Sequence, residues 1–245
     1  MSLVQYLNQY KNTFKIPSNN KSIDIRPITT GQMKNLLMYE DNNDPFIVDG
    51  ILDDIINGCV ITEGFNIDNL TIQDRFSLLI EIRKISKGEV YQFQWKCPEC
   101  KTINNGSINL DELEIIPFKS DVETKIEILP GFSVFLDYVR RKYQKQALSI
   151  VNNIDNLSSK QKLIEIATYT YALAMKGFET PDGQNTEPTL DMKVELLNSL
   201  DNKLYSKIVK WYSDNNYGIV FKHNFSCINC KHKQLLDIPI SSFFG

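Results

Sequence analysis

The chain reads Tyr91-Gln92-Phe93-Gln94-Trp95-Lys96-Cys97-Pro98-Glu99-Cys100-Lys101 in one place and Phe221-Lys222-His223-Asn224-Phe225-Ser226-Cys227-Ile228-Asn229-Cys230-Lys231 in another. Each stretch has aromatic residues at alternate positions and ends in Cys-x-x-Cys followed by lysine. A shift of 130 positions aligns the two stretches without a gap, and it also pairs Ile108, Leu110 and Leu113 with Ile238, Ile240 and Phe243. Because such alternation is typical of a half-buried strand, each stretch is predicted to form a strand that leads into a Cys-x-x-Cys turn, here called a knuckle, and then into a second strand. The sequence therefore predicts two copies of this unit, which together form a ribbon.

The two motifs supply four thiols, from Cys97, Cys100, Cys227 and Cys230. Four cysteine ligands at this spacing are typical of a closed, tetrahedral, structural zinc site. Two separate thiol pairs or chance disulfides are the alternative. A redox role is disfavoured, because a thioredoxin-like motif opens a helix, whereas residues 101–106 indicate a turn. The sequence therefore predicts a structural Zn2+ that joins residue 97 to residue 230.

Residues that flank the knuckles are expected to stabilise the negatively charged sulfurs. We expect backbone N–H groups to bond the sulfurs, and nearby lysines to offset the negative charge of four thiolates on one zinc ion. Four thiolates complete the coordination sphere, so both histidines of the chain are expected to be bystanders. The lysines are Lys96, Lys101, Lys231 and Lys233, and the two histidines are His223 and His232.

Length and composition limit the class of protein. The chain has 245 residues, of which 42% are hydrophobic and 23% charged, which is typical of a soluble globular protein. A net charge of −3 gives no global basic surface for nucleic acid. No apolar run reaches the roughly 18 residues of a membrane span, and the first residues lack a secretory signal pattern. Five cysteines fit a reducing cytosol.

Before the first knuckle the periodicity is mainly helical. Thr71 is a candidate N-cap, and Gly88 a candidate stop, for a helix that leads into the first ribbon strand. Cys59 is expected to be a buried small residue at a helix end. The expected elements are helices at 1–17, after Gly31, at 46–57 and at 72–87, and strands at 22–28 and 89–95.

Between the knuckles we expect a mostly helical insertion. Pro130-Gly131 between two alternating runs predicts a hairpin of 125–129 with 132–136. Helices are expected at about 137–153, 158–177, 189–200 and 203–214, and a loop at 180–188. The predicted fold class is α+β and mainly helical, with a four-cysteine ribbon formed from two distant halves. The predicted domains are 1–88, 89–113 with 219–245, and the insertion 114–218.

The sequence lacks a recognisable catalytic constellation, so a non-enzymatic protein is expected. With two histidines and neither a Walker A nor an H-E-x-x-H motif, little remains for acid–base or metal catalysis. Asp53, Asp54 and Glu63 are expected to be solvated surface. The basic cluster of Arg140–Lys142 with Lys145 is expected to be a solvated helix face, with phosphate contact as the alternative.

Aromatic residues offer two interpretations. Tyr91, Phe93, Trp95, Phe221 and Phe225 are expected to form a small core between the ribbon halves, and base stacking is the alternative. Trp211 is expected in the core of the insertion, together with Tyr205 and Ile208. The apolar tail 238–245 either packs in the ribbon or docks on a partner.

The segment from Ile23 to Cys100 resembles a known family. It begins with Ile25-Arg26-Pro27, continues through Ile55–Cys59 and Phe65–Leu70, and runs from Ile82–Glu89 into the first knuckle. This order is similar to the baseplate hub assembly family of T-even-like contractile-tailed phages. The resemblance covers about a third of the chain.

The resemblance implies an assembly role without catalytic residues. Such proteins help to build the central hub of the tail baseplate, as minor components or as chaperones. It implies other tail hub proteins as partners, self-association being left open, and a place in the host cytoplasm during assembly or in the virion baseplate. The alternatives are a zinc-ribbon nucleic-acid-binding or transcription factor, which the acidic pI disfavours, and a metal-dependent enzyme, which would need an open metal site.

Overall fold

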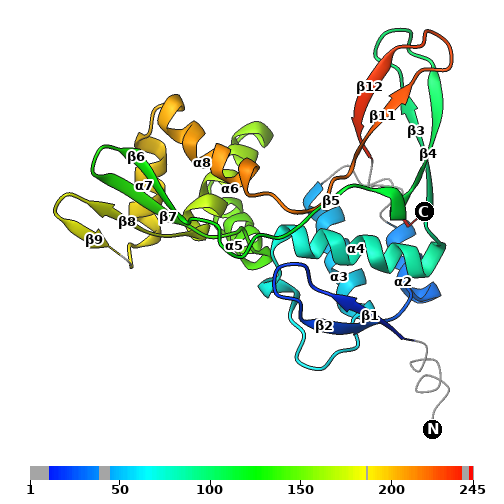
Figure 1. The fold of residues 1–245 in the computed structure, drawn as a ribbon, viewed down its shortest axis with the longest axis horizontal. Coiled ribbons are helices and arrows are strands. Elements are labelled where there is room, and N and C mark those ends of the chain that lie inside the picture. The colour runs from blue at the N-terminus through cyan, green and yellow to red at the C-terminus, as the bar shows by residue number, and fades with distance from the viewer. Residues whose placement is uncertain (1–10, 39–44, 186, 239–242, 245) are drawn as a thin grey trace. The chain divides into compact units, whose positions relative to one another are not determined.

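A computed structural model describes residues 11–38, 45–185, 187–238 and 243–244. The chain is α+β, as the sequence predicts, and it divides into two compact units. The first unit comprises Met1–Ile67, Asp74–Pro117 and Gly218–Gly245, and the second comprises Asp68–Gln73 and Phe118–Tyr217. Figure 1 labels the elements of both units.

The first part of unit one is built from a small hairpin and helices. Thr29 and Gln32 form a capping box that starts the first of these helices. Gly88, with φ of 87°, ends the last one, since a left-handed residue there closes the helix. The elements are β1 (Asn12–Lys15), β2 (Ser22–Ile25), α2 (Thr30–Leu37), α3 (Pro45–Cys59), the 3-10 turn η1 (Ile67–Asn69) and α4 (Ile72–Lys87).

The helix predicted over 1–17 is wrong where it can be compared. Residues 12–15 form β1, which pairs antiparallel with β2 so that Phe14 lies opposite Ile23. The Thr13 hydroxyl also donates to Asp24 Oδ1 at 3.1 Å. Leu3, Leu7 and Tyr10 lie outside the described residues. The strand arises because β2 offers a hydrogen-bonding edge, which a helical spacing of apolar residues does not reveal.

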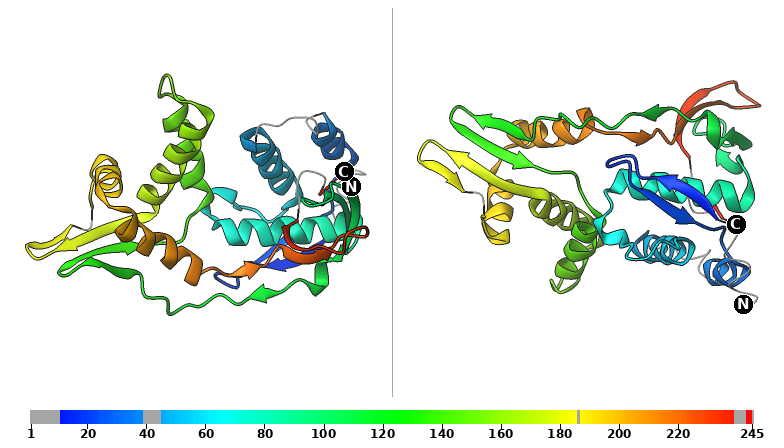
Figure 2. Two further views of the ribbon diagram at one scale, coloured as in Figure 1. Left: turned by 90° about the horizontal axis from the view of Figure 1, so that it is seen from above. Right: turned by 60° about the horizontal axis from the view of Figure 1, so that its bottom comes forward.

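Two hairpins form the ribbon of unit one. Each is a separate two-stranded antiparallel sheet, and Figures 1 and 2 show the two hairpins side by side. Lys96 pairs with Ile103, and 130 positions later Ser226 pairs with Lys233, so the two hairpins have the same register. The hairpins are β3 (Val90–Lys96) with β4 (Ile103–Asn109), and β11 (Lys222–Ser226) with β12 (Lys233–Asp237).

An aromatic cluster fills the space between the hairpins, as predicted. The ring centroids of Phe93 and Phe225 lie 5.3 Å apart, and those of Trp95 and Phe225 lie 6.3 Å apart. Phe243 packs edge-on against Tyr91 at 5.1 Å and against Phe221 at 5.7 Å. The end of the apolar tail therefore packs at the ribbon, and these rings are held in a core.

Arg83 of helix α4 links this aromatic cluster to the helical part of unit one. Its buried guanidinium donates to the carbonyl oxygens of Phe243 at 2.6 Å, Gly88 at 2.8 Å and Val90 at 3.3 Å. It also lies 5.9 Å from the ring centroids of Tyr91 and Phe243. One side chain of α4 thereby joins the helix end, the first hairpin and the tail.

A short pair of strands lies where the chain leaves and re-enters unit one. After the 3-10 turn η2 (Leu110–Glu112), β5 (Ile115–Ile116) pairs antiparallel with β10 (Gly218–Ile219). Val220 N–H also donates to Glu114 O at 2.9 Å. These bonds close the long excursion between the knuckles, whose entropic cost rises only slowly with loop length.

Unit two combines a four-stranded antiparallel sheet with four helices (Figures 1 and 2). The strand order is β6-β7-β8-β9, and the hairpin at Pro130-Gly131 forms as predicted. The elements are β6 (Lys125–Leu129), β7 (Phe132–Leu136), α5 (Arg141–Asn152), α6 (Ser159–Ala174), β8 (Met175–Thr180), β9 (Gly183–Asn185), α7 (Leu190–Ser199) and α8 (Asn202–Asp214).

Half of this sheet was not expected. The helix predicted to Gly177 ends at Ala174, and the predicted loop at 180–188 contains β9. The chain leaves the helix because β8 pairs with β7, placing Phe178 opposite Val134. The insertion therefore carries a four-stranded sheet beside its four predicted helices, where only the hairpin of β6 and β7 was predicted.

Trp211 lies in the core of unit two, as predicted. Its indole N–H donates to Glu123 O at 2.8 Å, which satisfies the polar atom of a buried ring. The buried members of this core are Ile128, Val134, Leu136, Ala172, Met175, Leu197, Ile208 and Trp211, and Tyr205 packs against them half-buried.

Candidate metal centre

The fold brings the four predicted cysteines together at the end of the ribbon. Their sulfurs all lie within 4.8 Å of one another. Cys97 Sγ is 3.7 Å from Cys230 Sγ, and Cys100 Sγ is 3.5 Å from Cys227 Sγ. A zinc–sulfur bond of about 2.3 Å implies about 3.8 Å between the sulfurs of a tetrahedral site. These four close cysteines could therefore bind a metal ion.

The two knuckles have the same backbone geometry. In each, the first cysteine donates its N–H to the residue five positions later, and the lysine after the second cysteine has φ of 60°. Left-handed residues other than glycine are uncommon, and here they turn the chain back towards the sulfurs. The bonds are Cys97 N–H to Thr102 O and Cys227 N–H to His232 O, both 2.9 Å, and Lys101 N–H to Cys97 O at 3.0 Å and Lys231 N–H to Cys227 O at 3.1 Å.

Hydrogen bonds to the sulfurs set the pKa values of the thiols. The hydroxyl and N–H of Thr102 lower the pKa of Cys100 to about 5. The N–H of Cys230 lowers the pKa of Cys227. The N–H of His232 also favours the Cys230 thiolate, but the neighbouring sulfurs, that of Cys100 first, raise the pKa of Cys230 to about 12. The expected backbone N–H donors are thus present, and the four thiols do not ionise alike.

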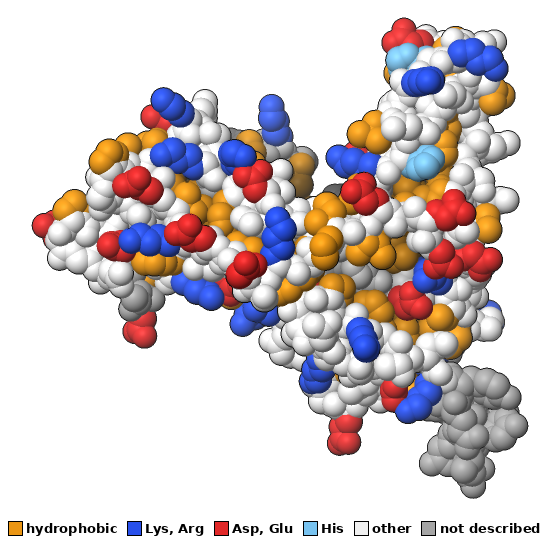
Figure 3. Space-filling view, viewed as in Figure 1, with side chains coloured by type: hydrophobic (Ala, Val, Ile, Leu, Met, Phe, Trp, Pro, Cys, Tyr) orange, Lys and Arg blue, Asp and Glu red, His pale blue; other side chains and the backbone are white. Residues whose placement is uncertain are grey.

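Access to the cluster is unequal. Cys97 and Cys227 are buried, Cys100 is half-buried and Cys230 is exposed. Figure 3 shows basic side chains near this end of the ribbon. The ammonium groups of Lys101 and Lys231 donate to the carbonyls of their own knuckles, at 2.6 Å to Pro98 O and 3.1 Å to Ile228 O. Positive charge is therefore held close to a site that would carry four thiolates.

Asn104 is a member of the site that the sequence analysis missed. It is 1% exposed, and its Oδ1 accepts from the N–H of Ile228 at 2.9 Å, which joins the first hairpin to the second knuckle. Its Nδ2 donates to Thr102 O at 2.9 Å, and Asn229 Nδ2 donates to Thr102 Oγ1 at 3.3 Å. The sequence pattern does not mark it, because residues 101–106 indicate a turn, whereas Asn104 lies at an inward position of β4.

The two histidines are not members of the cysteine cluster. The His223 ring lies 5.0 Å from the ring of Phe225. The backbone carbonyl of His232 accepts the hydrogen bond from Cys227 N–H in the second knuckle. Cys59 is fully buried, as expected, and burial raises the pKa of its thiol.

Several charged residues that were expected to be solvated are instead buried or paired with an opposite charge. Asp53 is buried and its Oδ1 lies 2.7 Å from Arg75 Nε. Within the basic cluster, Arg141 is buried, and Lys145 pairs with Asp68 at 2.6 Å. The prediction of a wholly solvated helix face is therefore wrong for this cluster. Helical periodicity does not show which charged side chains meet partners from distant segments.

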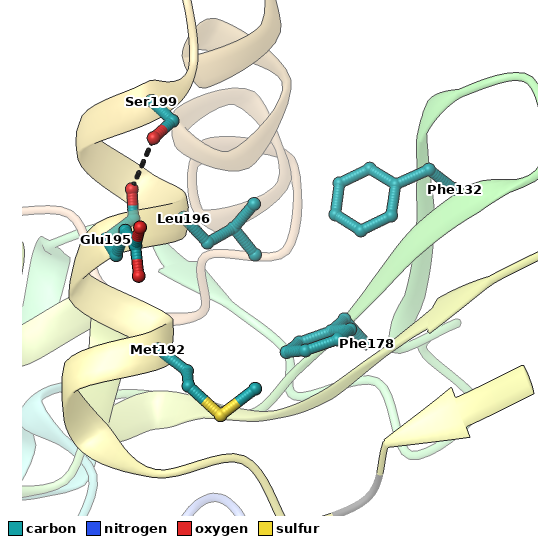
Figure 4. A pocket seen from close by; sticks show the side chains of 6 residues that line it. All are labelled: Phe132, Phe178, Met192, Glu195, Leu196 and Ser199. Carbon is teal, nitrogen blue, oxygen red and sulfur yellow. Dashed lines mark hydrogen bonds between the residues drawn. The ribbon is translucent and has the colours of Figure 1, made fainter.

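An apolar pocket of about 280 Å³ lies in unit two. Figure 4 shows its wall, where α7 faces the paired strands β7 and β8. The pocket was not predicted, since it combines residues from three separate elements. The lining residues are Phe132, Phe178, Met192, Glu195, Leu196 and Ser199.

Among the helices of the described residues, none is long and apolar enough to cross a membrane.

Comparison with known proteins identifies the family. No curated protein and no solved structure matches the chain. A family model described as "T4 bacteriophage base plate protein" matches residues 7–245, which include both ribbon halves and the whole insertion. This confirms the resemblance to phage baseplate proteins and extends it far beyond residues 23–100. The chain belongs to the family of T4 bacteriophage base plate proteins.

Proposed function

We propose that the chain is a non-enzymatic assembly protein of the tail baseplate hub, either a minor hub component or an assembly chaperone, that acts through protein–protein contacts. The observation that carries the proposal is the match to the baseplate family over residues 7–245. It acts in the host cytoplasm during assembly, where tail hub proteins are its partners, and the virion baseplate is its destination if it stays bound.

A structural zinc ion is part of the proposal. The support is a set of four cysteine sulfurs within 4.8 Å, with the spacing of a tetrahedral site. Soft thiolate ligands favour zinc over hard cations such as Mg2+ or Ca2+. With four protein ligands the metal would have no position for a substrate, so its role would be to staple the ribbon. One metal per chain is the expected stoichiometry, measured by elemental analysis of purified protein.

We place partner contacts in the N-terminal region 1–88 and in the insertion 114–218, with residues 89–113 and 219–245 as the metal-stapled ribbon. In the insertion, the pocket of unit two supports this assignment. Its lining is apolar apart from Ser199 and the carboxylate of Glu195. That combination fits an apolar side chain of a hub protein that is followed or preceded by lysine or arginine. Buried apolar anchors of this kind supply most of the energy of an interface.

The test is a pull-down of tagged protein from infected host cells, with and without nuclease, read by mass spectrometry. Recovery of tail hub proteins that survives nuclease supports the assembly role. Recovery of nucleic-acid-processing proteins that is lost on nuclease treatment overturns it and favours the alternative, a zinc-ribbon nucleic-acid factor.

Two matched variants test the pocket in the same experiment. Met192 and Val209 lie on different helices of unit two and are each 42% exposed, but only Met192 lines the pocket. Met192→Asp should abolish recovery of the hub partner, because it places a charge where an apolar anchor would sit. Val209→Asp should leave recovery unchanged. Equal recovery with both variants would remove the pocket from the proposal and leave the assembly role standing.

A further inference from the structure

Asn104 joins the two knuckles without using a sulfur atom. Its side chain is buried and it bonds in two directions, to the N–H of Ile228 in the second knuckle and to the carbonyl of Thr102 beside the first. Thr102 itself lies 3.2 Å from Cys100 Sγ through its hydroxyl, and the same oxygen accepts from Asn229. A chain of polar contacts therefore crosses the site beside the cysteines.

The two halves of the ribbon differ at this point despite their common register. The position equivalent to Asn104 is Gln234, and the position equivalent to Ile228 is Pro98. Proline has no N–H to donate, so the second hairpin cannot repeat the bond. Consistently, Gln234 Oε1 is buried without a hydrogen-bond partner among the described residues.

From this asymmetry we infer that Asn104 is a positioning residue of the metal centre, which docks the second knuckle on the first hairpin before a metal ion binds. The inference rests on the proposed metal site. A buried bond between the knuckles lowers the conformational freedom that metal binding must remove, so it favours a partly formed site in the metal-free protein. Partners of this kind, one step removed from the ligands, typically contribute about 10–100-fold to metal affinity.

The test compares Asn104→Leu with Gln234→Leu in the full-length chain. The two changes are the same in kind, occupy equivalent positions and leave all four cysteines in place. Affinity for Co2+, a coloured substitute for zinc, is measured by absorption, and exchange of the Ile228 amide is measured in metal-free protein. We expect Asn104→Leu to weaken Co2+ binding by about 10–100-fold and to expose the Ile228 amide in the metal-free state. Gln234→Leu should change neither, because the buried Oε1 of Gln234 has no hydrogen-bond partner among the described residues.

Different results overturn different claims. If wild-type protein binds no Co2+, the proposed metal site fails and takes this inference with it. If it binds Co2+ with a tetrahedral thiolate spectrum but the two variants bind equally well, the inference alone fails. An Ile228 amide that is unprotected in metal-free wild-type protein would also overturn it, since the knuckles would then meet only around the metal.

Discussion

The two hairpins of the ribbon have one register and two different environments. In the first hairpin, Tyr91, Phe93 and Trp95 are 1–8% exposed. At the equivalent positions of the second hairpin, Phe221 and Phe225 are half-buried and His223 is exposed. The same strand pairing is therefore embedded in a core in one copy and lies at the edge of that core in the other.

The difference shows what each copy depends on. The first hairpin is held by Arg83 of α4 and by the ring of Phe243, independently of the cysteines. The outer part of the second hairpin contacts the first through Phe225, Asn104 and the sulfurs. We therefore expect the first hairpin to keep its structure without the proposed metal ion. The second hairpin should become less stable, with contacts such as the Asn104–Ile228 bond still holding it to the first.

Removing the proposed zinc ion should give the largest effect. Structural zinc in finger peptides contributes about 10–16 kcal/mol, which is as large as the stability of a whole domain. After chelation, or in Cys227→Ser, protection of the β11 and β12 amides from hydrogen exchange should fall further than that of the β3 amides. The Ile228 amide, which Asn104 holds, should be the last of the second hairpin to lose protection, and assembly function should be lost through this partial unfolding.

Cys59→Ala is the control for the metal experiment, because Cys59 is buried but is not a member of the cluster. It should keep one metal per chain. Unchanged exchange and melting in a sample verified to be metal-free would contradict the prediction, as would a folded, fully functional Cys227→Ser protein.

Acidification should release the proposed zinc ion and thereby destabilise the same second hairpin. Metal-bound thiolates hold no protons, whereas unfolded thiols, with pKa of about 8.5, hold them at pH 7. The unfolded state thus binds more protons, so metal-dependent stability rises with pH and is lost as pH falls. The loss should therefore continue throughout the fall from pH 7 to pH 5. Near pH 5 the Cys100 thiol of the metal-free chain, with its pKa of about 5, also takes up a proton and adds to the competition with the metal.

This dependence is measured as metal retained after dialysis at each pH, with β11 amide exchange as a second readout. A metal content independent of pH between 7 and 5 would argue against four thiolate ligands.

Arg83→Met should be the largest effect on the first hairpin. It removes three hydrogen bonds from a buried cation and leaves three carbonyls without that donor, for an expected loss of about 3 kcal/mol in the free energy of unfolding. The neighbouring Lys84→Met removes ion pairs of partly exposed groups with Glu81 and Asp111 and should cost less than about 1 kcal/mol. Urea denaturation at saturating metal gives both values, and equal values would show that Arg83 is not the anchor.

Gly106→Ala should have a smaller effect than Arg83→Met and should separate the copies by packing alone. A Cβ at Gly106 would come within 2.7 Å of the Phe93 ring, which Phe225 holds in place. Overpacking typically costs about 1–3 kcal/mol, partly offset here by the lower freedom of alanine in the unfolded chain. The equivalent residue is Leu236, so the second hairpin has no such gap to fill. An unfolding free energy unchanged by Gly106→Ala would mean that the Phe93 ring can shift.

Local patterns were sufficient for much of this protein. The cysteine spacing, the 130-residue repeat, the turn at Pro130-Gly131 and the stop of α4 at Gly88 could be predicted, because neighbouring residues determine each of them. The aromatic alternation likewise predicted a ribbon core. Rings on one face of each hairpin are removed from water mainly by packing against the other hairpin.

Pairings between distant segments could not be predicted in this way. The sequence by itself determined that two knuckles of equal geometry exist and that they carry four thiols. Only the tertiary structure decided that β1, β8 and β9 are strands, that Asp53 and Arg141 are buried, and that Asn104 rather than Gln234 holds the opposite knuckle. The physical reason is that a strand edge, a buried charge and a bridging amide are each defined by a partner far along the chain, and periodicity reports only on neighbours.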